Sequence, residues 1–372
     1  MPFSEFVGNP ETIHRLREML ARNRFPHAVI LCGAHGSGKY TLALMLARAM
    51  NCLEQPCTDG TGGTDGLPDF CGRCSNCTRI AQAEDLDARF AEAVEARENL
   101  RDTDRKETRL FVQTHPDVLI IPPDPPQLMI KVDQVRHVIE TIYYRPAEAR
   151  ERVYIFTSSA FMKEAANSLL KVLEEPPEFA TIFLLAENPG ELLPTIRSRS
   201  MTFSLGALAF TEIESRLAQL RPDWNPRQRA LVARLSEGAM GRALSFDLES
   251  YVAARNHALV MLKSALGAGD HTELFKVTET YRSGAEGREK IENLLRTLYS
   301  LLEDLMFLQS GAARLVRNTD ILGELKKMSE AANFAWVQRA ADGLGEVERG
   351  LRRNLLRSLS LDAFATALER VS

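Results

Sequence analysis

The stretch GAHGSGKYT, residues 33–41, decides the fold because it follows a short apolar run and precedes an amphipathic one. Its glycines at positions 33, 36 and 38 and its lysine at 39 have the spacing of a phosphate-binding loop. In such a loop, backbone N–H groups and the dipole of the following helix point at phosphate, and the lysine neutralises its oxygens. The sequence therefore predicts a nucleotide-binding P-loop formed by Gly33, Gly36, Gly38 and Lys39.

The residue after the lysine departs from the P-loop pattern. A P-loop ATPase normally has a serine or threonine there, whose short hydroxyl holds Mg²⁺. Tyr40 carries its hydroxyl at the far end of a ring, and Thr41 lies about 100° further around the helix. The run at 152–156, expected to be the strand that presents an acidic magnesium ligand, ends in Thr157-Ser158 instead. The sequence leaves room for bound ATP but argues against hydrolysis.

Short runs rich in β-branched residues alternate with helical patterns in the first half of the chain. The predicted strands are 28–33, 118–123, 152–156 and 181–186, and the predicted helices are 10–22, 39–50, 131–143 and 163–174. This alternation predicts an α/β domain with a parallel sheet that ends near residue 205. Strand patterns then cease, and the rest of the chain is expected to form two helical domains.

Composition limits the classes of function. The 372 residues are 45% hydrophobic and 26% charged, which is typical of a soluble globular protein with two or three domains. A net charge of −4 and a pI of about 6.1 provide no global basic field, so any DNA contact must be local or shared with partners. Neither an apolar run of about 18 residues nor a signal-peptide pattern occurs, so we expect a cytoplasmic protein without membrane segments.

One segment, residues 83–113, is dense in charges of both signs. We interpret it as a solvated insertion that forms an exposed helix followed by a mobile stretch.

Most of the six cysteines lie close together after the P-loop helix, which indicates a metal site rather than a disulfide framework. Cys71, Cys74 and Cys77 in CGRCSNC have the spacing to bind one tetrahedral metal ion. Cys52 is the expected fourth ligand, and Cys57 is its alternative. Zinc is the expected metal, although part of an iron–sulfur pattern has similar spacings.

Six segments occur in the order found in bacterial sliding-clamp loader subunits of DNA polymerase III, and the chain resembles this family. They are FVGNPETIHRL (6–16), FPHAVILCGAHGSGK (25–39), CGRCSNC (71–77), HPDVLIIPP (115–123), AANSLLKVLEEPPEFATIFLLAENPGELLPTIRSRS (165–200) and EGAMGRALSF (237–246). The resemblance implies an AAA+ domain over 1–205, with a zinc module at about 52–77. It also implies a small helical lid over 206–248 and a ring-forming helical collar over 249–372.

Within this family the chain is most similar to the delta-prime type, which does not hydrolyse ATP. The related gamma/tau motor subunits have threonine after the P-loop lysine, Asp-Glu on the acidic strand and an arginine in the lid. This chain has Tyr40, Thr157-Ser158 and Gly241 at those positions, with Arg242 one place out of register. A gamma/tau-like ATPase motor is the alternative interpretation.

The resemblance also implies a role for Arg199. In the family, the arginine of a Ser-Arg-Cys triplet projects toward ATP held by the adjacent subunit and acts in trans as an arginine finger. Arg199 matches that residue, between Ser198 and Ser200. A guanidinium there would stabilise charge that develops on the γ-phosphoryl oxygens. The residues alone also allow Arg197 and Arg199 to form ordinary surface ion pairs.

The partners that the resemblance implies are gamma/tau and delta subunits and, through the assembly, the sliding clamp and primed DNA. Lys163, Asn167 and Lys171 are spaced to share one helix face, which we interpret as a DNA- or clamp-contacting face or as a solvated one. An autonomous zinc-dependent DNA-binding module is a further alternative, which the acidic pI disfavours.

Overall fold

The computed structural model describes residues 2–54, 66–267, 271–282, 287–353 and 355–369. The chain divides into two compact units. Unit 1 comprises residues 1–208 with 238–242, and unit 2 comprises residues 209–237 with 243–372. The division into a P-loop domain, a lid and a collar stays a prediction.

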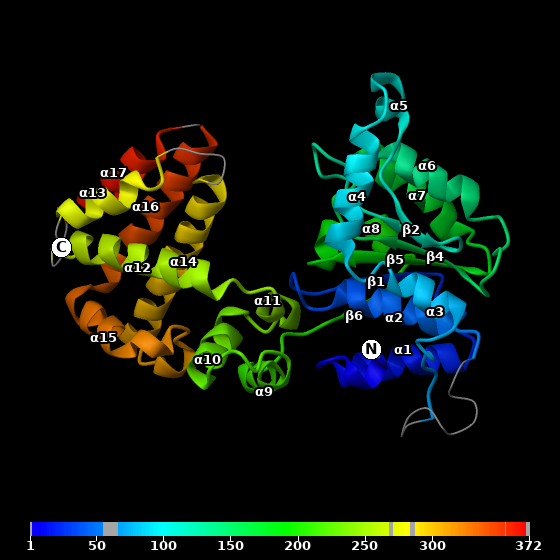
Figure 1. The fold of residues 1–372 in the computed structure, drawn as a ribbon, viewed down its shortest axis with the longest axis horizontal. Coiled ribbons are helices and arrows are strands. Elements are labelled where there is room, and N and C mark those ends of the chain that lie inside the picture. The colour runs from blue at the N-terminus through cyan, green and yellow to red at the C-terminus, as the bar shows by residue number, and fades with distance from the viewer. Residues whose placement is uncertain (1, 55–65, 268–270, 283–286, 354, 370–372) are drawn as a thin grey trace. The chain divides into compact units, whose positions relative to one another are not determined.

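A six-stranded sheet forms the centre of unit 1, with strands in the order β2-β3-β4-β5-β1-β6. Figure 1 shows this sheet between the helices of the unit. The pair β2–β3 is antiparallel and the other pairs are parallel. The strands are β1 (Ala28–Cys32), β2 (Val112–His115), β3 (Val118–Ile121), β4 (Arg152–Phe156), β5 (Ala180–Ala186) and β6 (Met201–Ser204). The predicted parallel sheet is confirmed, whereas β2 and β6 were not predicted.

Helices cover both faces of this sheet. Val29 and Leu31 of β1 pack into one buried cluster with α1 and α2, while Ala28, Ile30 and Cys32 pack into another with α6 and α7. The helices are α1 (Pro10–Ala21), α2 (Lys39–Asn51), α3 (Ser75–Ala81), α4 (Leu86–Glu98), α5 (Asp102–Glu107), α6 (Val132–Thr141), α7 (Lys163–Glu174) and α8 (Pro194–Arg197). Because both faces are buried, the central strands are continuous apolar runs.

The charged insertion contains the exposed helix that the sequence predicts. No residue of α4 is buried, and the Asp85 side chain caps the helix by accepting a hydrogen bond from the backbone N–H of Ala88. The stretch that follows, expected to be mobile, contains the short helix α5. Arg97 on α4 forms an ion pair with the fully buried Asp124 after β3 (2.7 Å), which Lys131 also contacts (3.1 Å). These contacts fix α4 to the sheet domain.

The regular elements of unit 2 among its described residues are all helices. One apolar core joins α12 to α17, with Trp336 and Leu298 among its fully buried side chains. The helices are α9 (Phe210–Leu220), α10 (Pro226–Leu235), α12 (Leu248–Ala265), α13 (His271–Glu279), α14 (Gly287–Gln309), α15 (Leu322–Ala331), α16 (Phe334–Arg352) and α17 (Arg357–Glu369). Helix α11 (Met240–Leu244) begins in unit 1 and ends in unit 2.

A buried polar network joins the cysteine-rich segment to the sheet edge. Asn76 on α3 donates to the Asn51 carbonyl (3.0 Å), and its Oδ1 lies 3.1 Å from His115 Nε2. His115 Nδ1 accepts the backbone N–H of Asp117 (3.1 Å), so the neutral ring must carry its proton on Nε2. Burial, reinforced by the charge of Arg79, lowers the pKa of His115 and favours this neutral form.

Asp117 anchors the loop before β4. Its carboxylate accepts the backbone N–H groups of Ala147 (2.8 Å), Glu148 (2.8 Å) and Ala149 (2.9 Å). Burial alone would raise the pKa of Asp117, but these three donors and the charge of Arg152 hold it below its usual range.

Replacing Asp117 with alanine should therefore lower the free energy of unfolding by about 3 kcal/mol, because buried donors lose a charged acceptor. Asp117→Asn keeps one acceptor oxygen and should cost less. Since the folded pKa of Asp117 lies below the unfolded value of about 3.9, its contribution is complete above that pH and is lost as the pH falls. Urea unfolding at neutral and acidic pH would measure both effects, and equal stability of the three proteins at neutral pH would contradict this assignment.

Candidate functional site

The predicted P-loop lies between β1 and α2, as the sequence requires. Gly36 and Gly38 have φ angles of +77° and +90°, which side-chain-bearing residues rarely adopt. A Cβ at Gly36 would lie 2.7 Å from the Arg242 nitrogen, and one at Gly38 would lie 2.8 Å from the Phe6 ring. The glycines therefore permit both the backbone turn and the close approach of two other segments.

Protein groups bind three backbone carbonyls of this loop, those of Gly33, Ala34 and Gly36. Lys39 Nζ donates to the carbonyls of Gly33 (2.6 Å) and Ala34 (2.8 Å), so the lysine folds back on its own loop. The carbonyl of Gly36 accepts the backbone N–H of Gly241 (2.8 Å). Gly241 and the residue after it, Arg242, thus both pack directly against the loop.

Acidic side chains near Lys39 come from the segment after β5, not from the end of β4. Burial lowers the pKa of Lys39, while the charges of Glu187 and Glu191 oppose that shift. Glu191 accepts a hydrogen bond from Ser159, which lies just after β4. The sequence did not point to Glu191, because its pairing with Ser159 joins two loops that are separated by a helix and a strand.

Tyr40 points away from the loop. Its hydroxyl donates to the backbone carbonyl of Ala83 (2.6 Å), and its ring packs against the buried cluster on the α1–α2 face. Burial, and then the charge of Glu84, raises the pKa of Tyr40, so the phenol is neutral at pH 7. Thr41 is exposed. Neither the Tyr40 nor the Thr41 hydroxyl therefore lies beside the phosphate-binding loop, where a magnesium ligand would have to be.

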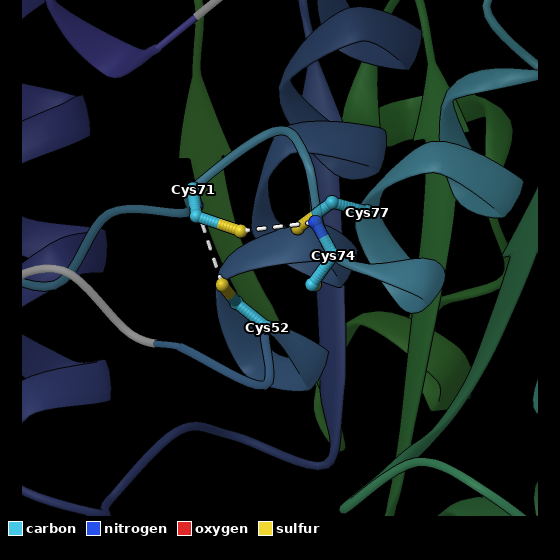
Figure 2. Close-up of side chains that lie close together, drawn as sticks. All are labelled: Cys52, Cys71, Cys74 and Cys77. Carbon is cyan, nitrogen blue, oxygen red and sulfur yellow. Dashed lines mark hydrogen bonds between the residues drawn. The ribbon is translucent and has the colours of Figure 1, made fainter.

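Four cysteines form a compact cluster beside the end of α2 (Figure 2). The Sγ atoms of Cys52, Cys71, Cys74 and Cys77 all lie within 4.8 Å of one another. Four sulfurs at about 2.3 Å from a tetrahedral zinc ion would be about 3.8 Å apart, so the donor set fits zinc. Cys57, the alternative fourth ligand, lies outside the described residues.

Backbone groups support the sulfurs. The N–H of Cys71 donates to Cys52 Sγ (3.2 Å), and the N–H of Cys74 donates to Cys71 Sγ (3.3 Å). Burial opposes ionisation of Cys74, but the N–H groups of Cys77 and Leu53 and the adjacent thiols bring its pKa to about 7. Burial instead raises the pKa of Cys71 and of Cys77, and a metal ion binds cysteine in the thiolate form.

Arg199 lies at the surface, two residues after α8. Its Nη2 forms an ion pair with Glu174 Oε1 (2.7 Å) at the end of α7, and its Nη1 donates to the Thr195 carbonyl (3.1 Å). Ser200 donates back to the Ile196 carbonyl (2.9 Å), so it does not displace the arginine. Both members of the ion pair are substantially exposed, at 36% and 51% of the side chain.

The α7 helix ends before Pro176-Pro177, as the sequence predicts. Lys163, Asn167 and Lys171 on this helix are all exposed. Their contact with DNA or a clamp stays a prediction.

The sheet, the loop between β1 and α2 and the cysteine cluster define a P-loop α/β protein with an inserted four-cysteine module. A model of the family described as DNA polymerase III, delta subunit, matches residues 8–209, which is more than half of the chain. The chain belongs to this family, within the clamp-loader proteins of DNA polymerase III.

The chain is similar to several individual proteins. The chain is 25% identical to DNA polymerase III subunit delta-prime of Bacillus subtilis over 93% of this chain and 92% of that protein. It is 28% identical to DNA polymerase III subunit tau of Escherichia coli over 74% of this chain, but this covers only 37% of the tau subunit. A solved gamma-subunit-related protein of Thermotoga maritima is 18% identical over 96% of this chain and 99% of its own, with a TM-score of 0.42.

Among the described helices, none combines the length and the apolar character needed to cross a bilayer.

Proposed function

We propose that this chain is a delta-prime-type clamp-loader subunit that does not hydrolyse ATP and donates Arg199 to the ATP site of a neighbouring subunit. The observation that carries the proposal is the contrast between a P-loop without a magnesium-holding hydroxyl and an arginine presented at the surface. The proposed partners are gamma/tau and delta subunits and, through the assembly, the sliding clamp and primed DNA.

The contacts of the P-loop bear on how tightly it would hold a phosphate. To bind a phosphate there, Lys39 would have to break its hydrogen bonds with the carbonyls of Gly33 and Ala34. It would also meet the negative charges of Glu187 and Glu191, which act on the same lysine. Lys39 and the glycines still provide phosphate-binding chemistry, so ATP held without hydrolysis is part of the proposal.

The contacts of Arg199 support its role as a finger. An exposed ion pair of the Arg199–Glu174 kind is worth at most about 1 kcal/mol, because solvent screens it. Arg199 can therefore exchange Glu174 for the phosphate of a neighbour at little cost. A guanidinium suits this task because it is always charged and presents several N–H donors in a plane.

The four-cysteine cluster is proposed to hold zinc. Four protein sulfurs leave no open coordination position, so zinc there would supply structural stability rather than catalysis. An iron–sulfur cluster is the alternative for the same sulfurs, and a brown preparation would favour it over a colourless one with one zinc ion per chain.

The purified chain, incubated alone with Mg-ATP, should release phosphate no faster than the Lys39→Ala variant. The reason is that position 40 has no short hydroxyl and the end of β4 has no carboxylate to hold magnesium. A phosphate-release assay measures this, and titration with a fluorescent nucleotide separately tests binding. Turnover on the order of 1 s⁻¹ that is lost in Lys39→Ala would sink the proposal and favour the gamma/tau-like motor, since kinases and related enzymes turn over at about 1–100 s⁻¹.

A further inference from the structure

The geometry points to a second role for the residue that replaces the magnesium-holding hydroxyl: Tyr40 tethers the four-cysteine module to the P-loop helix. The module is defined as residues 70–84, which carry three of the four cysteines, together with Cys52. This inference rests on the proposed metal site and concerns how the chain holds that site.

One face of α2 carries the contacts to the module. Tyr40, Arg48 and Asn51 occupy positions i, i+8 and i+11 of the helix, which brings them to the same side. Cys52, the first cysteine of the cluster, follows directly at the end of α2. The P-loop helix is therefore the support on which the whole module rests.

Tyr40 and Arg48 hold the two flanks of the module. The Tyr40 hydroxyl donates to the carbonyl of Ala83 (2.6 Å). Ala83 is only 1% exposed, and it lies two residues after α3, the helix that carries Cys77. Arg48, itself only 3% exposed, pairs with Glu84 and lies over the Phe70 ring at 5.3 Å. Phe70 precedes Cys71, so both ends of the cysteine segment are attached to α2.

Only a long side chain with a terminal donor can do this from position 40. A serine or threonine hydroxyl would stay beside the helix backbone, near the loop, and would leave the buried carbonyl of Ala83 without its donor. Tyrosine in place of serine or threonine at position 40 thus removes a magnesium ligand and provides the tether. Loss of the tether should loosen the segment that carries Cys77, and the metal should then leave more readily.

The test compares Tyr40→Phe with Thr41→Ala in the full chain. Tyr40→Phe keeps the packed ring and removes one hydroxyl, while Thr41→Ala removes an exposed hydroxyl from the next residue. Zinc transfer to the chromogenic chelator pyridylazoresorcinol should be about fivefold faster in Tyr40→Phe, the factor expected for one net hydrogen bond. Thr41→Ala should match the wild type. Release at the wild-type rate in Tyr40→Phe would overturn the tether.

Hydrogen exchange separates the tether from the metal proposal. Amides of residues 78–84 should exchange faster in Tyr40→Phe than in the wild type, whichever metal is bound. If the wild-type protein contains no metal, the proposed metal site fails, and exchange in this segment still decides the tether. Unchanged exchange would refute it.

Tyr40→Thr gives a third readout, because it restores the hydroxyl that a P-loop ATPase would have. It should accelerate zinc release more than Tyr40→Phe does, since the packed ring is also lost. It should not create ATPase activity, because the end of β4 still has no carboxylate. Mg-ATP turnover in Tyr40→Thr with an unchanged rate of zinc release would show that position 40 serves the nucleotide site instead.

Discussion

Replacing Arg199 with alanine is expected to slow ATP hydrolysis roughly 10³-fold at the neighbouring site that this arginine completes. The loss follows from transition-state electrostatics, since the guanidinium would stabilise charge that appears on the γ-phosphoryl oxygens as the bond breaks. Assembly should be unaffected, because the contacts of Arg199 within its own chain are a surface ion pair with Glu174 and hydrogen bonds to the Thr195 carbonyl and the Ser198 hydroxyl. The measurement is single-turnover hydrolysis by a reconstituted clamp loader with primed DNA, together with gel filtration of the complex.

Arg197 offers a matched control for this experiment. Arg197 has the same charge as Arg199, is the last residue of α8 and is exposed. Arg197→Ala should hydrolyse ATP like the wild type. Arg199→Lys should recover only part of the activity, because lysine provides the charge without the planar set of donors. Equal loss in the Arg197 and Arg199 variants would indicate a general effect of surface charge, and no loss in either would remove the proposed finger.

Replacing Cys77 with serine is expected to remove the metal and unfold the module locally. Structural zinc sites bind with apparent free energies of about 10 kcal/mol or more, so loss of one of four ligands should abolish stoichiometric zinc. Cys77 lies on α3 and is only 1% exposed, so the change also places a hydroxyl in a site built for sulfur. Metal analysis and limited proteolysis near residues 70–84 would measure the effect.

Cys32→Ser is the control for that experiment. Cys32 is buried in β1, outside the cluster, and its Sγ lies 3.2 Å from the Ser204 hydroxyl, a neighbour that a serine could also contact. This variant should keep its zinc. If Cys77→Ser retains one zinc ion per chain, the proposed ligand set is wrong, whatever its effect on stability.

Continuous apolar runs made the central strands predictable, because strands covered on both faces have no polar side. The two unpredicted strands lie at the edges of the sheet. Strand β6 has only Phe203 buried, and β2 is buried only at Val112 and His115. Short edge strands with mostly exposed residues have no apolar periodicity from which a strand could be predicted. Their positions depend on pairing with strands from elsewhere in the chain.

The candidate site was predictable where spacing alone determines the geometry. The glycines and Lys39 of the P-loop come together because they are neighbours in one turn, and the short cysteine spacings limit how far the sulfurs can separate. The direction of Tyr40 was not predictable, since its partner Ala83 is brought near by the fold of the inserted segment. The same holds for Glu174 beside Arg199 and for Glu191 beside Ser159, because side-chain pairing between distant segments leaves no local pattern.

The position of β1 has a consequence for the synthesis of the chain. Ala28 pairs with Ile182 and Val29 with Met201, so β1, an interior strand, has no partner until most of unit 1 has left the ribosome. At about 5–20 residues per second, the nascent AVILC segment waits about 10–30 s for its neighbours. Its apolar side chains lack the strands that cover them during that interval, whereas α2 and the cysteine segment can form early from local contacts.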